Sequence, residues 1–202
     1  MKLLNLLSLL ILTFLIGCNQ SSPVSSSQET ALVFSDYGVF QSKITFKNSY
    51  NTKTRIDSCV ANGDGSSVCT QFINGQAQYT AQMTSDGKMT SAQYYVPSTF
   101  NATLNPALST IGNTFILNTK YNTSTTITYT DVNGNLIGNV NMAVTSTVQK
   151  STYNNYSDCI TLITSMVMTA NGKTTQSDGT DTYCKGIGEV KSTDATDTWI
   201  RQ

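Results

Sequence analysis

Alternating apolar and polar residues fill most of the chain after about residue 30, in short segments separated by Asn-Gly and Asp-Gly pairs. Such pairs are the strongest short-range signal for tight β-hairpin turns. The turn signals lie at Asn74-Gly75, Asp86-Gly87, Asn133-Gly134, Asn171-Gly172 and Asp178-Gly179, with a longer one at Asn62-Gly63-Asp64-Gly65. Helix formers are scarce, whereas Thr, Tyr, Val and Ile are plentiful. The pattern therefore predicts an all-β body of antiparallel strands.

The first turns impose strand registers that can be checked for consistency. A three-residue loop at the long turn puts Val60 opposite Val68, and a two-residue turn at the next signal puts Thr70 opposite Tyr79. The following turn puts Tyr79 opposite Tyr94. One face then collects the apolar residues Val60, Val68, Phe72, Ala77, Tyr79, Ala81, Met83, Tyr94 and Val96. We expect a meander that is buried on one side and wet on the other.

The same reasoning predicts a later hairpin and a connecting segment. With Asn133-Gly134 as the turn, Ile127 faces Val140. Between residues 96 and 118 two prolines interrupt strand pairing, and the segment from Asn105 to Leu108 is compatible with a short helical turn. We expect this segment to cover one edge or end of the sheet. The predicted fold is an antiparallel meander forming an open barrel or a strongly twisted sheet, and a β-sandwich is the alternative.

The first twenty residues follow a different pattern. Lys2 precedes an apolar run from Leu3 to Ile16, which Gly17 and Cys18 end. A basic start, a short apolar core and a small-residue exit are typical of a secretory signal, and the run is shorter than the roughly 20 residues of a transmembrane helix. The tetrapeptide Leu15-Ile16-Gly17-Cys18 resembles the lipobox of bacterial lipoproteins. That resemblance implies diacylation of the Cys18 thiol, cleavage before it and acylation of the new amino terminus.

The lipobox divides the chain into a lipoprotein signal peptide over 1–17, a lipidated flexible tether over 18–30 and a single β-rich domain over 31–202. The tether is rich in Ser and Gln and cannot bury enough apolar surface to fold. Asn19 stands where inner-membrane lipoproteins of Gram-negative cells carry aspartate. By this resemblance the protein is anchored in the cell envelope, at the outer membrane if the source is Gram-negative.

Four cysteines remain when Cys18 is set aside, and an even set in an exported chain is typical of a disulfide framework. A two-residue turn near residue 171 places Cys159 opposite Cys184, at a non-hydrogen-bonded site within reach of a disulfide. Cys59 and Cys69 lie opposite each other across the long turn. Each predicted disulfide therefore links the two strands of one hairpin.

Composition limits the chemistry. The chain has 12 basic and 12 acidic residues, and 12% of its residues are charged, which argues against a basic patch for nucleic acid. It contains no histidine, so Ser-His-Asp and Cys-His catalysis are excluded. It also has no Cys-x-x-Cys spacing of the kind that structural zinc sites use. We expect no cofactor and no metal.

Paired carboxylates remain as candidates, since two suffice for glycoside hydrolysis. The candidates are Asp178, Asp181, Asp194 and Asp197. Their turn-like polar surroundings favour solvated loop positions. The run from Asp131 to Asn135 places oxygen ligands as a calcium loop begins, but it lacks the later glycine and glutamate of such a loop. A hairpin turn explains the same residues more simply.

Tyrosines are the remaining candidates for a binding surface. Tyr79 and Tyr94 fall on the predicted inner face, where aromatic packing accounts for them. Tyr95, Tyr153 and Tyr156 are predicted to be more exposed and are candidates for contacts with a ligand or partner.

The carboxyl-terminal run Tyr183-Cys184-Lys185-Gly186-Ile187-Gly188-Glu189-Val190-Lys191 resembles the strand that ends many bacterial envelope lipoproteins of the open β-barrel, lipoprotein-carrier-like type. The resemblance implies a fold more than an activity. Gly186 and Gly188 would fall on one face of that strand and leave room for a neighbouring element.

The sequence thus predicts a non-enzymatic envelope lipoprotein that binds a lipid, peptide or partner protein through a sheet face or edge. The alternative is a structural or surface-exposed interaction lipoprotein without a small-molecule ligand. The expected partners are the membrane, through the lipid anchor, and a lipid or protein, with no nucleic acid. The sequence identifies no ligand-binding residue.

Overall fold

A computed structural model of the 202-residue chain describes residues 31–38, 41–109 and 112–202. The elements in these ranges are β1 (Leu32–Val33), the 3₁₀ helix η1 (Phe34–Asp36), β2 (Lys43–Asn48), β3 (Thr54–Ala61), β4 (Ser67–Ile73), β5 (Gln76–Met83), β6 (Met89–Tyr94), β7 (Phe100–Leu108), β8 (Thr114–Phe115), β9 (Lys120–Thr130), β10 (Leu136–Tyr153), β11 (Tyr156–Ala170), β12 (Lys173–Cys184), β13 (Gly188–Thr193) and β14 (Thr198–Arg201). The predicted signal peptide, Cys18 and the tether lie outside the described residues. Within the described ranges, no helix has the length and apolar character needed to cross a membrane.

Twelve antiparallel strands close into one barrel, in the order β10-β11-β12-β13-β14-β2-β3-β4-β5-β6-β7-β9. Each strand of this ring pairs with the next one along the chain, except that β7 pairs with β9 and β14 returns to β2. β8 pairs instead with β1 in a small separate sheet. The all-β prediction is confirmed, and the barrel is closed rather than open.

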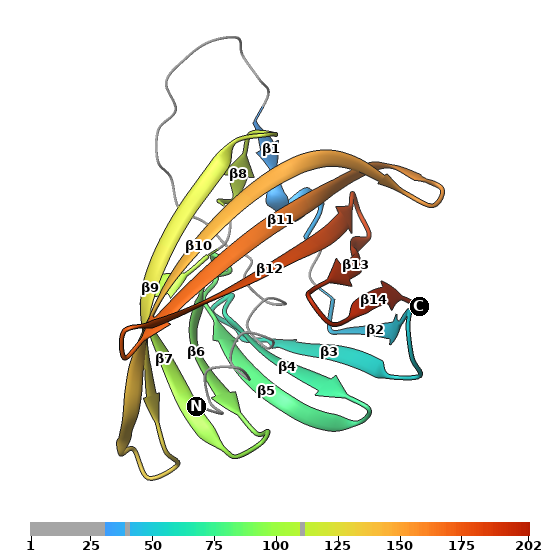
Figure 1. The fold of residues 1–202 in the computed structure, drawn as a ribbon. Coiled ribbons are helices and arrows are strands. Elements are labelled where there is room, and N and C mark those ends of the chain that lie inside the picture. Colours follow the sequence, from blue (N-terminus) through green and yellow to red (C-terminus); the bar gives the residue numbers. More distant parts are fainter. Residues whose placement is uncertain (1–30, 39–40, 110–111) are drawn as a thin grey trace.

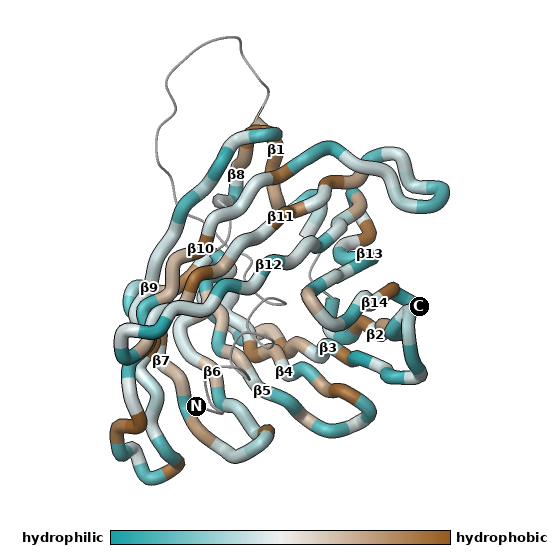
Figure 2. Tube along the Cα trace, in the orientation of Figure 1, coloured by the Kyte–Doolittle hydropathy of each residue, from teal (hydrophilic) through white to brown (hydrophobic). Residues whose placement is uncertain are grey.

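The barrel wall is tall on one side and low on the other. β10, β11 and β12 have 18, 15 and 12 residues, whereas β2, β13 and β14 have 6, 6 and 4. Figure 1 shows the long β10–β11 hairpin extending past the short strands. In Figure 2 hydrophobic segments interrupt the hydrophilic colours along β10 and β11, whereas β12 is hydrophilic over most of its length. Successive side chains of each strand point into and out of the barrel.

Apolar side chains from β4 to β7 and from β9 to β11 form one buried cluster inside the barrel. Tyr94 stacks on Phe100 with the ring centroids 4.8 Å apart, and Phe100 meets Tyr129 edge-on at 5.7 Å. Each fully buried side chain of this size contributes about 1.5–3 kcal/mol. This cluster is therefore the main apolar core of the barrel.

A second apolar cluster fixes the plug, by which we mean residues 31–38 together with 112–117. Phe34 of η1 packs edge-on against Phe115 and Tyr183, with ring centroids 6.4 and 5.3 Å away. The buried members of the cluster are Phe34, Tyr37, Phe115, Val148, Ile160, Leu162 and Tyr183. The plug thus covers part of the inner face of β10–β12.

The predicted register is wrong by one residue between β4 and β5. Gln71, rather than Thr70, lies opposite Tyr79, because the ladder shifts at this point. The additional residue is Gln78, which forms a β-bulge in β5. A one-residue shift moves every side chain of a strand to the opposite face.

The predicted buried face of β3 and β4 is consequently wrong. Val60 is 65% exposed, and its partner Val68 shares the outer face with the pair Ile56 and Phe72. Beyond the bulge the prediction holds, and the buried inner residues are Tyr79, Ala81, Met83 and Tyr94. The inward positions of β3 therefore belong to residues of the other parity, Arg55 and Asp57, which are both buried.

The registers of the later hairpins are confirmed. Ile127 lies opposite Val140, although the turn has three residues: the amide of Asp131 bonds the carbonyl of Asn135 at 2.9 Å. A bulge after Leu136 compensates for the longer turn. The longer turn and the bulge therefore offset each other, and the predicted register of β9 and β10 is unchanged.

Both disulfides expected from the registers are present. Cys59 is paired with Cys69, and Cys159 with Cys184. The β11–β12 ladder runs from its turn to Cys159 without a register shift.

The expectation of a helical turn near Pro106 is wrong. β7 continues as a strand from Phe100 to Leu108, and it accommodates the proline through a cis peptide bond after Asn105. β7 is a member of the barrel rather than a cover over one end.

The carboxyl-terminal motif is also not one strand. β12 ends at Cys184 and β13 begins at Gly188, so the motif contains the turn between them. Gly186 and Gly188 have φ angles of 73° and 93°, a region that favours glycine.

We predict that Gly38→Ala weakens the plug, since its Cβ would lie 2.1 Å from the Cε1 atom of Phe34. The ring must then leave its contact with Tyr183, and we expect the free energy of unfolding to fall by about 1–3 kcal/mol. Urea unfolding measures this. The control is Gly63→Ala, where no atom lies within 4 Å of the added carbon and a change below about 0.5 kcal/mol is expected. Equal stability of both variants would contradict the plug packing.

Candidate functional site

A group of charged side chains lies inside the barrel, close to where the last strand, β14, pairs with β2. Arg55 and Asp57 occupy alternate positions of β3 and share its inward face. On β13 a bulge at Val190 allows Glu189 to lie opposite Tyr183 while Ser192 lies opposite Asp181. The alternation of side chains along β3 and the bulge in β13 therefore bring residues of an N-terminal and a C-terminal strand together.

Arg55 is the centre of this charge cluster, which we define as Arg55, Asp57, Asp181 and Glu189. Its side chain is 1% exposed, and its Nη2 lies 2.6 Å from Glu189 Oε1 and 2.8 Å from Asp57 Oδ2. Its Nε donates to the same Asp57 oxygen at 3.0 Å. The guanidinium carbon lies 4.0 Å from the ring centroid of Phe46. Arg55 is thus fixed by two charge-assisted contacts and one cation–π contact.

The charge cluster holds three buried carboxyl groups and one guanidinium. Burial raises the pKa of Glu189 to about 8, although Arg55 acts in the opposite direction. Burial likewise raises the pKa of Asp181 to about 6, against a hydrogen bond from Ser192. One cation cannot compensate three buried carboxylates, so the cluster retains a proton near neutral pH.

A pocket of about 390 Å³ opens beside this cluster, between the plug and strands β3 and β4. It is lined by Phe34, Ser35, Gly38, Gln41, Ile44, Asp57, Cys59, Ala61, Gly65, Ser67, Cys69, Met83, Thr84, Ser85, Asp86, Gly87, Gly112, Asn113, Tyr183 and Glu189. Every charged residue in this lining is an acid. The pocket therefore joins an apolar wall to a polar inner end.

The two disulfides lie on opposite sides of the barrel wall. Cys59 and Cys69 face inwards and form part of the pocket lining. Cys159 and Cys184 pack outside the ring with Val190. Sequence reasoning located both bonds but gave no sign that one of them borders a pocket.

The four candidate aspartates do not form one site. Asp181 is buried in the charge cluster, so its expected solvated position is wrong. Asp178 is exposed on β12 and accepts a hydrogen bond from Gln176 at 3.1 Å. Asp194 and Asp197 lie in the β13–β14 turn.

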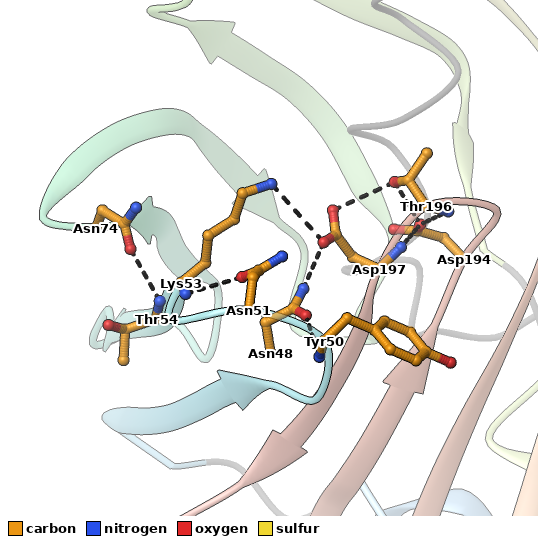
Figure 3. A network of polar contacts seen from close by, with 9 residues as sticks. All are labelled: Asn48, Tyr50, Asn51, Lys53, Thr54, Asn74, Asp194, Thr196 and Asp197. Atoms are coloured by element: carbon orange, nitrogen blue, oxygen red, sulfur yellow. Dashed lines mark hydrogen bonds and ion pairs between the residues drawn. The ribbon is translucent and has the colours of Figure 1, made fainter.

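Figure 3 shows the polar network of that turn. Asp194 Oδ1 accepts hydrogen bonds from the backbone amides of Thr196 and Asp197, at 2.7 and 2.8 Å. Asp197 in turn accepts a bond from Asn48 and lies 3.8 Å from the ammonium of Lys53. These aspartates therefore connect the β13–β14 and β2–β3 turns.

The carboxylate of Asp131 is also engaged within its turn. It accepts bonds from the backbone amides of Asn133 and Asn135, at 2.9 and 2.8 Å. Among the described residues no group of three or more His, Cys, Asp or Glu side chains is placed to hold a metal ion.

The candidate tyrosines are not brought together. Tyr79 and Tyr94 are buried in the core. Tyr95 follows β6 and donates to Thr80 at 3.2 Å, whereas Tyr153 and Tyr156 flank the distant β10–β11 turn. They form no common surface.

Sequence reasoning missed Arg55, Asp57 and Glu189 as site residues. The available signal was the shared parity of Arg55, Asp57 and Cys59, which places all three on one face of β3. Nothing local to the sequence connects that face with Glu189, which lies 134 positions away.

Comparisons of the chain with protein-family models, curated proteins and solved structures give no match.

We predict that stability falls as pH rises from about 5 to 8. Glu189 has an ordinary pKa of 4.5 and a folded-state pKa of about 8, so the folded protein binds more protons than the unfolded chain between these values. Its stabilising contribution is complete below pH 4.5 and is lost as pH rises towards 8, by on the order of 4 kcal/mol. Urea unfolding at several pH values measures the slope.

Glu189→Gln should flatten this pH dependence above about pH 6, because the amide cannot ionise; below that value Asp181, whose pKa is raised to about 6, still contributes. The control is Asp178→Asn, which removes an exposed carboxyl whose pKa is lowered by hydrogen bonds from Ser165 and Gln176. That variant should keep the wild-type slope. A wild-type stability that rises between pH 5 and 8 would show that Glu189 is stabilised as the ion instead.

Proposed function

We propose that this protein is a non-enzymatic envelope lipoprotein that binds a small amphipathic molecule in the pocket at the barrel end. The observation that carries the proposal is the 390 Å³ pocket, which combines apolar walls with polar and acidic side chains. Pockets of about 300–1,000 Å³ with this composition are typical of small-molecule sites.

The size of the pocket favours a small ligand over the other expected partners. A stable protein–protein contact buries about 800 Å² on each partner, which requires an extended surface rather than a pocket. Among the ligands considered from the sequence, a lipid-like molecule fits this geometry better than a peptide or a folded protein.

A structural or surface-exposed interaction role remains the second candidate, and one observation favours it. The bulge in β5 leaves the pairs Val60–Val68 and Ile56–Phe72 on the outer face of β3 and β4. Val60 is 65% exposed there. The polar pair Ser58–Thr70 lies between them on the same face. Apolar side chains gathered on an outer face are a feature of contact surfaces.

The pocket can be tested with N-phenyl-1-naphthylamine, a neutral apolar probe whose fluorescence rises in apolar sites. We predict one-to-one binding to the wild-type protein and at least tenfold weaker binding to Ala61→Trp, because Ala61 lines the pocket. Val60→Trp is the matched control, since the neighbouring residue lies on the outer face. Failure of the wild-type protein to bind the probe or any co-purified lipid would refute ligand binding and favour the second candidate.

The anchor is tested separately. We predict that mass spectrometry of membrane-fraction protein finds an acylated peptide beginning at Cys18, because the motif from Leu15 to Cys18 resembles a lipobox. Cys18→Ser should release the protein from the membrane fraction. An unmodified Cys18 in membrane-bound wild-type protein would refute lipidation without affecting the pocket.

A further inference from the structure

The inner end of the pocket carries negative charge that the protein does not fully balance. Asp57 and Glu189 line the pocket there, and Asp181 is buried in the same charge cluster. Arg55 contacts two of these carboxyl groups but is absent from the lining. A molecule entering the pocket therefore meets the carboxyl groups and not the guanidinium.

The rim of the pocket differs from its inner end, because the acid there, Asp86, forms an ion pair. Asp86 lies 2.6 Å from the ammonium of Lys88 and also accepts a hydrogen bond from Thr84. The charge imbalance is therefore confined to the buried end, where electrostatic interactions are least screened.

The wall between the rim and the inner end is largely apolar. Its apolar members are Phe34, Ile44, Cys59, Ala61, Cys69 and Met83. An apolar ligand body would replace water along this wall, at a gain of roughly 25 cal/mol per Å² of apolar surface removed from water.

We infer that the pocket selects cationic amphiphiles, small molecules with an apolar body and a protonated amine that binds against Asp57 and Glu189. This inference rests on the proposed function and names its ligand class. An ammonium group donates up to three hydrogen bonds, and its bonds to carboxylates are among the strongest in proteins. A neutral headgroup lacks this attraction, and a carboxylate ligand would add a fourth acid to the cluster.

The inference is tested with three ligands of equal chain length: octylamine, octan-1-ol and octanoate. Each displaces N-phenyl-1-naphthylamine from the full-length protein at pH 7.5, and the displacement gives its dissociation constant. We expect octylamine to bind at least tenfold more tightly than octanol, and octanoate to bind more weakly than octanol.

Two variants locate the source of this preference. Glu189→Gln and Asp57→Asn should each reduce the octylamine-to-octanol ratio at least threefold. Binding of the neutral probe should remain within about threefold of wild type, which shows that the pocket is intact in each variant. The control Asp178→Asn alters an exposed carboxyl away from the pocket and should leave the ratio unchanged.

The outcomes separate this inference from the function on which it rests. Equal binding of amine and alcohol, or an unchanged ratio in both variants that retain probe binding, overturns the cationic selectivity and leaves the pocket as a ligand site. Tighter binding of octanoate overturns it in favour of an anion site. If neither the probe nor any of the three ligands binds, the proposed function fails and this inference fails with it.

Discussion

The contact between Arg55 and Glu189 connects an N-terminal and a C-terminal strand across the place where the barrel closes. Arg55 belongs to β3 and Glu189 to β13, and the ring runs between them through β14 and β2. We call these two intervening strands with β13 the closing seam. Three residue pairs join β13 to β14, and three join β14 to β2, whereas twelve join β10 to β11. The backbone ladders are therefore shortest at the closing seam, where side chains must help to select the correct strand pairing.

Polar side chains supply that specificity at the closing seam. Arg201 donates to the carbonyl of Ile187 and to the side chain of Gln41, both at 2.6 Å. The contacts of Asp197 with Asn48 and Lys53 connect the turns at the other end of the same strands. A buried ion pair adds little net stability compared with a well-packed apolar pair, but removing one partner costs about 3–5 kcal/mol. The charge cluster therefore adds little to the stability of the folded barrel. It disfavours misaligned closure instead, because misalignment would leave a buried charged group without its partner.

The sequence predicted hairpins better than it predicted the site, and the reason is the range of the interactions. The pairing of Cys159 with Cys184 follows from one tight turn and an uninterrupted alternation, which are local features. The inward face of β3 depends instead on the single bulge at Gln78, which no residue type announces. Since the side-chain period of a strand is two, that bulge alone exchanges Val60 for Arg55 as an inward residue. Glu189 can be identified as the partner of Arg55 only from the strand order of the closed barrel, which the hairpin turns do not specify.

The same carboxyl groups hold the closing seam and line the pocket, which couples the stability of the barrel to its contents. An apolar residue at Glu189 would avoid the cost of a buried acid, but it would remove the partner of Arg55 and the polar end of the pocket. Three acids share one cation in the charge cluster, and a bound proton makes up part of this deficit of positive charge. A cationic ligand would fill it without the proton. Ligand binding would then stabilise the folded barrel by mass action, most at the pH values where the acids alone destabilise it.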